Sequence, residues 1–529
     1  MTYRVLATDK LAPQGVEIFR ANSEIEFDSK PGLSPAELAA TIGQYDALVI
    51  RSGTKVTAEI LREPGRLRVI GRAGIGVDNV DVATATKKGI VVMNTPGGNN
   101  VTTAEHTITL MLALARWIPQ ADASLHAGKW ERSKFEGSEV CNKTLGVIGL
   151  GNIGTIVAER AQGLRMKIIA FDPFITAEAA ARMKVELVTL DELYARADFI
   201  TVHTPLTPET RGLVNRAAIA KMKKGVRLVN CARGGIVDEQ DLADAIASGH
   251  VAGAALDVFV DEPPAADHPL LRLPQVIATP HLGASTSEAQ VNVAVAIAEQ
   301  VTKFLLRGEV ESAVNMPSVS REMLTLLQPY LSLGEKLGSL VAQLSPDPVS
   351  ELSVEYAGQV ADLDARPVTN AILRGLLSPF LDAAVNYVNA PAIARERGIK
   401  VREARASKSS AFVNSMKVAV ARTSGTREVE GAIFGRDILR LVRIDDFYME
   451  AVPEGYVLML NNRDVPGVVG RVGTLLGARG INIAGLELGR EKIGGRAISF
   501  FHVDDAVPEA VLAELRQSPE IISAQLLKL

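Results

Sequence analysis

Short, fully apolar runs alternate with longer stretches of helical spacing over the first hundred residues of the chain. A continuous apolar run predicts a strand that is buried on both faces, because a half-exposed strand would alternate polar and apolar positions. Such strands separated by helices are typical of a parallel sheet that is covered by helices on both sides. The expected strands are Arg4–Ala7, Ala47–Ile50, Arg68–Gly71 and Ile90–Met93.

The same alternation restarts at Lys143 and continues to about Gly283, which predicts a second doubly wound domain. Between the two domains, Thr102 and Glu105 have the spacing of a capping box, so we expect a long helix to start there and to run to about Gly128. The expected strands of the second domain are Thr144–Ile148, Lys167–Phe171, Phe199–His203, Val226–Asn230, Gly253–Leu256 and Val276–Thr279.

The rest of the chain adds two further units. Helical periodicity from Ser285 to Arg307 could return the chain to the first domain, and the last segment has the β-α-β-β-α-β order of a ferredoxin-like domain. We therefore predict an α/β chain with two Rossmann-like doubly wound domains, an α+β intervening domain and a ferredoxin-like C-terminal domain. The predicted bounds are 1–98 plus 285–316, 99–284, 317–453 and 454–529.

Composition narrows the class of protein. The 529 residues carry 57 Lys+Arg against 61 Asp+Glu, a formal net charge of −4, so the chain lacks the basic balance that non-specific nucleic-acid binding needs. Two cysteines make a disulfide framework implausible. The N-terminus has no signal-peptide pattern, and no apolar run approaches the ~18 residues of a membrane span. We expect a cytoplasmic protein with no metal and with neither nucleic acid nor membrane as partner.

A glycine-rich turn predicts a dinucleotide site in the second domain. Gly149, Gly151 and Gly154 follow an expected strand directly and open an expected helix. Glycines at this spacing allow a tight turn and let the backbone approach a pyrophosphate at the helix N-terminus. Asp172 lies at the end of the next strand, where a carboxylate can accept from the ribose hydroxyls and repel a 2′-phosphate. This arrangement favours NAD over NADP.

Three further residues suggest acid–base chemistry on a 2-hydroxy acid. Arg233, Glu262 and His281 each follow an expected strand of the same domain, so they could converge at the crevice beyond the strand ends. An imidazole can exchange the hydroxyl proton, and a neighbouring carboxylate orients the ring and favours its charged form. A guanidinium can hold the substrate carboxylate through two hydrogen bonds.

Each of these residues also has an ordinary structural explanation. Arg233 could be a surface ion-pair partner, Glu262 a charge before a proline, and His281 a capped core histidine. For one residue alone the structural explanation would be preferred. Their joint occurrence on the loops of one dinucleotide domain favours catalysis.

The same segments resemble those of the D-isomer-specific 2-hydroxyacid dehydrogenases, and over essentially its whole length the chain resembles the long-form phosphoglycerate dehydrogenases of that family. The resemblance implies that Arg233 binds substrate and that Glu262 and His281 form the proton-transfer pair. It implies contacts to NAD from Asn152, Ile153, Asp172, Cys231, Ala232, Arg233, Asp257, His281, Gly283 and Ala284.

The resemblance extends to the segments that face the substrate in this family. Arg51 and Arg72 would supply positive charge for a phosphate, although on position alone either could be a solvated charge at a strand end. The implied substrate contacts are Arg51, Ser52, Gly53, Arg72, Gly74, Gly76 and Asn99. The cluster around Trp130 resembles a segment that reaches a neighbouring subunit, which implies a homo-oligomer, a dimer or a tetramer. Trp130 could equally serve simple dimer packing.

The C-terminal segment resembles an ACT domain, the module with which this family often senses L-serine. Asp464 and Asn482 would then hold the amine and the hydroxyl of the effector. The alternative is that these residues only build turns and a pairing edge. Arg463 lies in the same segment, and its cation would discourage an ammonium ligand.

Together these resemblances imply the NAD-dependent oxidation of 3-phospho-D-glycerate to 3-phosphohydroxypyruvate, which opens L-serine biosynthesis. One alternative is a hydroxypyruvate or glyoxylate reductase, which shares the nucleotide and acid–base segments. The C-terminal domain and the two arginines argue against it. Another alternative is an NAD-sensing corepressor of the same fold, against which the regulatory type of C-terminal domain argues.

Overall fold

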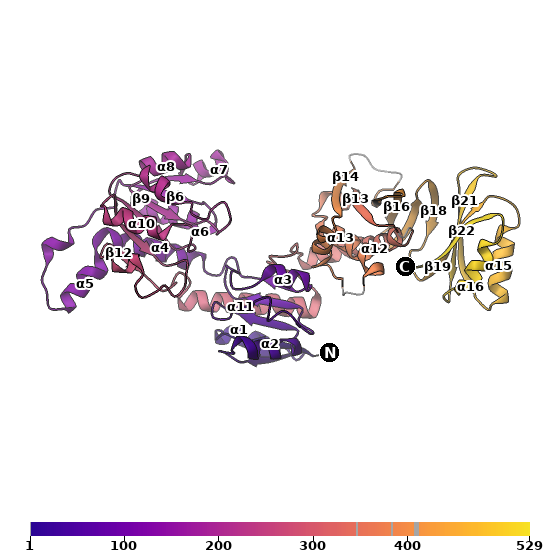
Figure 1. Ribbon diagram of the computed structural model, residues 1–529, viewed down its shortest axis with the longest axis horizontal. Coiled ribbons are helices and arrows are strands. Elements are labelled where there is room, and N and C mark those ends of the chain that lie inside the picture. The colour runs from indigo at the N-terminus through magenta and orange to yellow at the C-terminus, as the bar shows by residue number, and fades with distance from the viewer. Residues whose placement is uncertain (1, 345–346, 382–384, 407–411) are drawn as a thin grey trace.

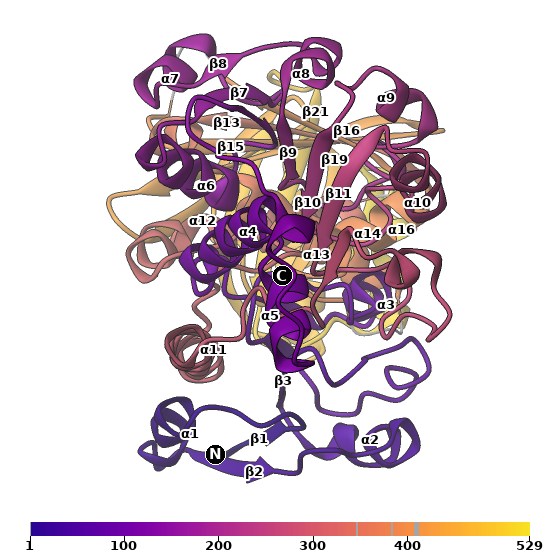
Figure 2. The ribbon, with the colours of Figure 1, turned by 90° about the vertical axis from the view of Figure 1, so that its left-hand side faces the viewer.

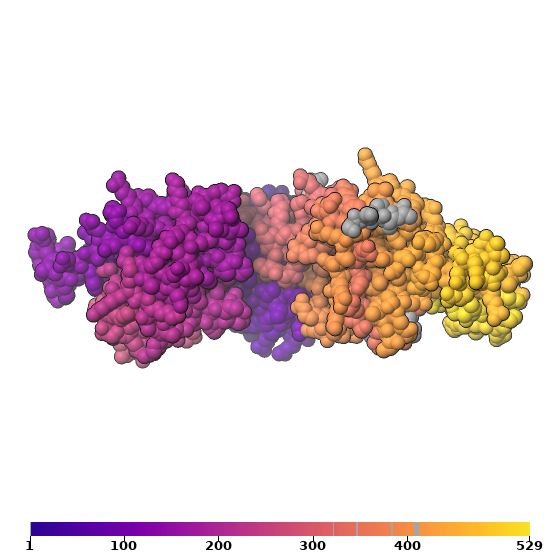
Figure 3. All heavy atoms as spheres, turned by 90° about the horizontal axis from the view of Figure 1, so that it is seen from above, coloured from indigo at the N-terminus to yellow at the C-terminus, as the bar shows by residue number. Residues whose placement is uncertain are grey.

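The strands of the chain form separate sheets that follow one another along an elongated molecule. The structure is a computed structural model, and it describes residues 2–344, 347–381, 385–406 and 412–529. In Figure 1 the second doubly wound unit lies at one end, the N-terminal sheet lies in the middle, and the two C-terminal sheets extend to the other end. Figure 3 shows the same succession from above.

The N-terminal sheet is parallel and has the order β2-β1-β3-β4-β5. The four predicted strands are confirmed, and β2 was missed because its sequence, Ile-Glu-Phe-Asp-Ser, mixes polar and apolar residues at a sheet edge. The strands are β1 (Tyr3–Ala7), β2 (Ile25–Ser29), β3 (Ala47–Ile50), β4 (Val69–Arg72) and β5 (Val91–Met93), and the helices are α1 (Pro13–Arg20), α2 (Pro35–Thr41) and α3 (Val82–Lys87).

Helix α11 (Ser287–Arg307) returns to this first sheet after the chain has built the second. Two glycines let it approach closely: a Cβ on Gly15 would lie 2.6 Å from the carbonyl oxygen of Ala294, and a Cβ on Gly71 would lie 2.8 Å from the Ile297 side chain. In Figure 2, α11 lies at a level between the N-terminal strands below and the larger sheet above. The first structural unit is therefore made of two stretches of chain.

The second sheet is also parallel, with the order β12-β11-β10-β9-β6-β7-β8. The direction of winding reverses between β6 and β9, and the carboxyl ends of strands at such a point open a ligand crevice. The six predicted strands are present, with the short edge strand β8 in addition. They are β6 (Thr144–Ile148), β7 (Lys167–Phe171), β8 (Glu186–Leu187), β9 (Phe199–Val202), β10 (Val226–Asn230), β11 (Val251–Leu256) and β12 (Val276–Ala278).

Helices cover both faces of this second sheet. They are α4 (Asn100–Arg116), α6 (Asn152–Gly163), α7 (Ala177–Arg182), α8 (Leu190–Arg196), α9 (Arg216–Ala220) and α10 (Glu239–Ala247). Helix α4 packs against α6, β10 and β11, so the segment between the two domains belongs to the larger sheet.

The prediction of a single long helix with a capping box at Thr102 is wrong in two respects. Helix α4 begins at Asn100, and its N-cap residue Asn99 makes no side-chain capping bond. The helix ends at Trp117, which adopts a left-handed conformation with φ 56°, because Pro119 has no N–H and its ring would clash with the preceding turn. The separate helix α5 (Ile118–His126) then projects from the end of the molecule without a buried residue (Figure 1).

The third sheet builds the intervening domain and has the order β14-β13-β15-β16-β17-β18. Helices α12 and α13 pack against each other, and α12 packs against β15, β16 and β17. The elements are α12 (Arg321–Gln343), β13 (Val349–Ala357), α13 (Arg366–Leu377), α14 (Ala390–Glu396), β14 (Lys400–Arg405), β15 (Ser415–Arg422), β16 (Gly425–Phe434), β17 (Ile438–Ile444) and β18 (Phe447–Ala451).

The C-terminal sheet confirms the predicted β-α-β-β-α-β order, with strands arranged β20-β21-β19-β22. One face carries the helices, and the other packs into the core of the intervening domain through Val457, Met459 and Phe500. The elements are β19 (Tyr456–Arg463), α15 (Val468–Ala478), β20 (Ile483–Arg490), β21 (Arg496–Val503), α16 (Glu509–Arg516) and β22 (Ile521–Lys528). Across the described ranges, no helix has the length and apolar character that a bilayer crossing requires.

Candidate active site

The glycine-rich turn joins β6 to α6 in the geometry that a pyrophosphate requires. Gly149 has φ 94°, and a Cβ on Gly154 would lie 2.0 Å from the carbonyl oxygen of Gly149, so both positions need glycine. Gly151 is the N-cap residue of α6, and a Cβ there would meet open space. The first N–H groups of the helix therefore face an open cradle, which fits the phosphates of a dinucleotide.

Asp172 lies beside this turn, directly after β7. One of its carboxylate oxygens accepts from the N–H of Leu150 at 2.7 Å and the other from the N–H of Phe174 at 2.8 Å. These bonds fix the orientation of the carboxylate, and each oxygen keeps a further lone pair. The group can therefore accept hydrogen bonds from the two ribose hydroxyls.

His281 and Glu262 form a hydrogen-bonded pair at the edge of the crevice. His281 Nδ1 lies 2.8 Å from Glu262 Oε2, and the two side chains are 49% and 39% exposed. Burial opposes the ionisation of Glu262, but the hydrogen bond and charge of His281 and the N–H of Phe259 outweigh it and lower the pKa of the carboxyl. Glu262 is therefore a carboxylate that orients the ring, and within the described residues His281 Nε2 has no protein partner.

Asp257 binds the loop that carries His281 through several hydrogen bonds. The side chain is buried, and its oxygens accept from Thr279 Oγ1 at 2.5 Å and from the N–H groups of Leu282 and Gly283 at 2.7 and 2.8 Å. His106 Nε2 lies 3.1 Å away. Burial raises the pKa of Asp257, but the bonds from His106, Thr279 and Leu282 outweigh it and lower the pKa.

Asp257 therefore shapes the loop that carries His281, which is held with φ 55°, and its implied contact to NAD stays a prediction. His106 was not predicted as part of the site, although its position on the helix opening at Asn100 could have pointed toward the crevice.

Arg233 connects the two doubly wound units. Its Nε donates to Asp78 Oδ2 at 2.8 Å, and its terminal nitrogen donates to the carbonyl of Ala232 at 2.7 Å. A Cβ on Gly76 would lie 1.9 Å from the guanidinium, so a side chain there would displace it. The Arg233 guanidinium is thus fixed where the two units meet, and its remaining N–H groups can donate to a carboxylate ligand.

Arg72 faces the same crevice from the first sheet. Burial, together with the Arg233 and Arg51 cations, lowers the pKa of Arg72 to about 10, and its buried Nε has no hydrogen-bond partner in the part of the chain that the structure describes. Gly74 leaves room for this guanidinium, because a Cβ there would lie 1.5 Å from it. Two neighbouring cations favour an anion between them.

Arg72, Arg233 and His281 line one cavity of about 280 Å³ between the two sheets. The structure brings together most of the implied cofactor and substrate contacts. They are Arg72, Gly76, Asn99, Asn152, Ile153, Cys231, Ala232, Arg233, His281, Gly283 and Ala284. Gly149, Gly151, Gly154, Asp172, Asp257, Glu262, Arg51, Ser52, Gly53 and Gly74 do not line the cavity wall.

Six cavity residues were missed by the sequence analysis: Ile75, Asn100, Thr103, His203, Thr204 and Pro205. Desolvation lowers the pKa of His203 to about 4, so its ring is neutral, and its Nε2 lies 2.9 Å from Thr201 Oγ1. The available signal was the position of His203 at the end of an expected strand of the dinucleotide domain.

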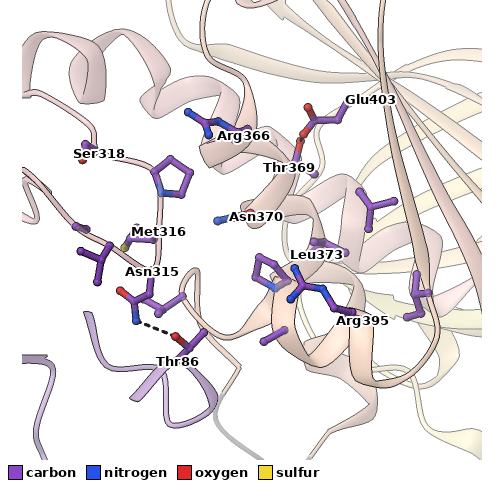
Figure 4. Close-up of a pocket in the computed structure, with 18 residues that line it drawn as sticks. Thr86, Asn315, Met316, Ser318, Arg366, Thr369, Asn370, Leu373, Arg395 and Glu403 are labelled. Carbon is purple, nitrogen blue, oxygen red and sulfur yellow. Dashed lines mark hydrogen bonds between the residues drawn. The ribbon is translucent and has the colours of Figure 1, made fainter. Parts of the chain in front are cut away.

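A larger cavity, of about 990 Å³, lies elsewhere, between the linker at Asn315 and the intervening domain (Figure 4). Asn315 is tied to Thr86 by a 3.0 Å hydrogen bond, and Arg366 and Arg395 are among the lining residues. None of the predicted site residues lines this cavity. The paired acid–base groups, rather than cavity size, identify the active site.

The two implied effector residues lie at opposite ends of the C-terminal sheet. Asp464 follows the end of β19 at Arg463 and accepts from the N–H of Gly494, whereas Asn482 precedes β20 and donates to Asp504. The prediction that both hold one serine is therefore not met within a single chain. A site that used both residues would need a second copy.

The arm that contains α5 exposes apolar side chains. Ile118 is 55%, Leu125 57% and Trp130 78% exposed. Large apolar groups gathered on a projecting segment are typical of an interaction surface.

Comparison with known protein families identifies three matches along the chain. Residues 108–283 match the D-isomer specific 2-hydroxyacid dehydrogenase NAD binding domain, residues 326–445 the D-3-phosphoglycerate dehydrogenase intervening domain, and residues 456–520 the ACT domain. The order agrees with the sheets described above.

Full-length relatives agree with these matches. The chain is 43% identical over 527 residues to D-3-phosphoglycerate dehydrogenase of Bacillus subtilis, with 100% of both chains covered. It is 45% identical over 520 residues to the protein of the same name from Methanocaldococcus jannaschii, covering 98% of each. Among solved structures, a glyoxylate reductase from a Paecilomyes species matches with a TM-score of 0.55 and 29% identity. That match covers 59% of this chain and 98% of the other.

Proposed function

The chain belongs to the D-3-phosphoglycerate dehydrogenase family of NAD-dependent 2-hydroxyacid dehydrogenases, and from this membership we propose which of its residues carry the reaction. The enzyme oxidises 3-phospho-D-glycerate to 3-phosphohydroxypyruvate with NAD, the first step of L-serine biosynthesis. The residue roles below are supported by the geometry of the crevice.

His281 is the proposed catalytic base. Its free Nε2 takes the proton of the substrate hydroxyl, and the Glu262 carboxylate at Nδ1 stabilises the imidazolium that forms. NAD, held at the turn between β6 and α6, would supply the acceptor for the hydride that leaves the carbon bearing this hydroxyl. Arg233 holds the substrate carboxylate and polarises the developing carbonyl. In the reverse direction, His281 returns the proton to the oxygen.

We place the proposed binding site of the nucleotide at the turn between β6 and α6. Asn152 and Ile153 open the helix at the pyrophosphate, and Asp172 accepts from the ribose. Cys231, Ala232, Gly283 and Ala284 line the cavity and would contact the bound cofactor. Burial raises the pKa of Cys231 to about 12, so its thiol is neutral.

The single observation that carries this proposal is that His281, which is paired with Glu262, lines one cavity together with Arg233 and the first residues of α6. A substrate panel tests it. Purified protein should reduce NAD with 3-phospho-D-glycerate and oxidise NADH with 3-phosphohydroxypyruvate far better than with glyoxylate. Activity confined to unphosphorylated acids would favour the reductase alternative.

The regulatory and assembly roles are further parts of the proposal. We infer a homo-oligomer, supported by the exposed arm around Trp130, and L-serine as an effector of the C-terminal domain, tested by repeating the panel with L-serine. A cytoplasmic location fits two cysteines that are both free. The domain bounds 1–98 plus 285–316, 99–284, 317–453 and 454–529 are proposed on the basis of the separate sheets.

Replacing Asp172 with alanine is expected to lower the preference for NAD over NADP by about tenfold or more, because the change removes a ribose acceptor and the charge that repels a 2′-phosphate. Values of kcat/KM with each nucleotide measure it. Asp191→Ala, which removes a surface carboxylate paired with Lys221, is the matched control. An unchanged ratio for Asp172→Ala would assign selectivity to another residue.

Replacing Arg72 with alanine should raise KM for the phosphorylated substrate about tenfold more than KM for hydroxypyruvate, because the lost cation faces the phosphate. KM values for both keto acids at saturating NADH give the ratio. Equal increases in KM for both keto acids would show that Arg72 does not bind the phosphate.

A further inference from the structure

Two side chains from other segments hold the loop of residues 51–54 at both of its ends. Asp9 Oδ2 accepts from the N–H of Arg51 at 2.6 Å and from the N–H of Thr54 at 3.2 Å. Asn79 Nδ2 donates to the carbonyl of Arg51 at 2.7 Å and to the carbonyl of Thr54 at 2.6 Å. One carboxylate oxygen and one amide nitrogen therefore bind the backbone of both end residues.

The middle of the loop is left open. Ser52 and Gly53 are exposed, and among the described residues their N–H groups have no protein partner. A Cβ on Gly53 would lie 2.5 Å from Asp9 Oδ1, so only glycine fits against the carboxylate in this arrangement. Unpaired N–H groups beside an arginine form a seat for an anion.

Asp9 and Asn79, which together form a clamp on this loop, also lie close to the cations Arg72 and Arg233. The residue before Asn79, Asp78, pairs with Arg233 at 2.8 Å. The charges of Arg51 and Asp9 both act on the guanidinium of Arg72. The orientation of the loop is therefore coupled to the part of the crevice that the substrate phosphate would enter.

We propose that Asp9 and Asn79 are positioning residues that shape the 51–54 loop into the seat for the substrate phosphate. The Ser52 and Gly53 N–H groups and the Arg51 side chain form that seat. This inference rests on the proposed function. Neither Asp9 nor Asn79 touches the substrate, and both act through the backbone of the loop.

The hydrogen bonds of Asp9 and its negative charge have opposite expected effects on phosphate binding. A negative charge beside a phosphate is unfavourable in itself, so its benefit must come from the two hydrogen bonds that a single oxygen accepts. Asparagine can accept both bonds with its one carbonyl oxygen, whereas alanine accepts neither. Asp9→Asn should therefore retain the seat that Asp9→Ala loses.

The test compares KM for 3-phosphohydroxypyruvate and for hydroxypyruvate in the full-length enzyme. Asp9→Ala and Asn79→Asp, whose carboxylate would face two carbonyl oxygens, should raise KM for the phosphorylated substrate about tenfold and leave KM for hydroxypyruvate within about twofold. Inhibition by inorganic phosphate should weaken in parallel. Asp9→Asn should stay near the wild type.

Asn215→Asp is the matched control, because Asn215 caps α9 in the other catalytic unit. Binding of NADH, followed by fluorescence, shows whether each variant is folded. If Asn79→Asp does not fold, the comparison of KM between Asp9→Asn and Asp9→Ala tests the inference by itself. Equal losses on both substrates, or an Asp9→Asn variant as impaired as Asp9→Ala, would overturn the inference. A wild type without activity on the phosphorylated substrate would instead contradict the proposed function.

Discussion

His281→Asn is expected to lower kcat for oxidation of 3-phospho-D-glycerate by about 10²–10⁴-fold, the usual contribution of a positioned acid–base group. Asparagine keeps a hydrogen-bonding side chain but cannot take the hydroxyl proton. Steady-state rates in both directions measure the loss. Binding of NADH should change little, because the proposed site of the nucleotide phosphates is the glycine turn rather than the imidazole.

The pH dependence provides an independent check on the same residue. Oxidation needs the neutral imidazole and reduction needs its protonated form, so kcat should fall on acidification in the first direction and on alkalinisation in the second. Glu262, whose pKa is lowered, stays ionised throughout the neutral range, so its titration does not cause these changes in kcat. A His281→Asn variant that kept the wild-type rate and pH profile would show that another group moves the proton.

Arg233→Ala is expected to lower kcat/KM for the same substrate by about 10²–10³-fold, the equivalent of roughly 3–4 kcal/mol. The loss has two parts: the substrate carboxylate loses its paired donors, and Asp78 is left without its cation. Arg233→Lys should recover little, because an ammonium cannot form the two-pronged hydrogen bond. The measurement is kcat/KM in both directions.

Arg216→Ala provides the matched control for Arg233→Ala. Arg216 pairs with Asp241 and Asp244 on the surface of the same unit and is 70% exposed. Its loss should change kcat/KM by less than about twofold, since exposed ion pairs contribute little. Similar losses for Arg216→Ala and Arg233→Ala would mean that the effect reflects damage to the domain rather than to substrate binding.

The parallel sheets could be predicted from the sequence because their strands are continuous apolar runs bounded by helices. Ala47–Ile50, Thr144–Ile148 and Val226–Asn230 were predicted with the bounds that the structure has. The edge strands β2 and β8 were missed, because a half-exposed or very short strand carries no such run. The break at Trp117 was also missed, although Pro119 was the available signal.

The candidate site could be predicted where a residue type and its place after a strand define a chemistry. Arg233, Glu262 and His281 fall into this class: His281 is paired with Glu262 and lines the same cavity as Arg233, and their catalytic roles stay predictions. The hydrogen bonds of Asp257 to the loop of His281 could not be predicted, because they join a buried carboxylate to N–H groups 25 and 26 residues further along the chain. The clamp of Asp9 and Asn79 likewise depends on contacts between segments that are distant in the chain. The separation of Asp464 from Asn482 follows from strand direction, which single motifs do not reveal.

A crystal structure with NAD and 3-phospho-D-glycerate bound is the most direct measurement of the central claim. The predicted result has the substrate hydroxyl within hydrogen-bonding distance of His281 Nε2, about 2.6–3.2 Å, with the carboxylate on Arg233 and the pyrophosphate at the start of α6. A complex in which the hydroxyl contacts a different base, while His281 and Glu262 remain paired and away from the substrate, would contradict it.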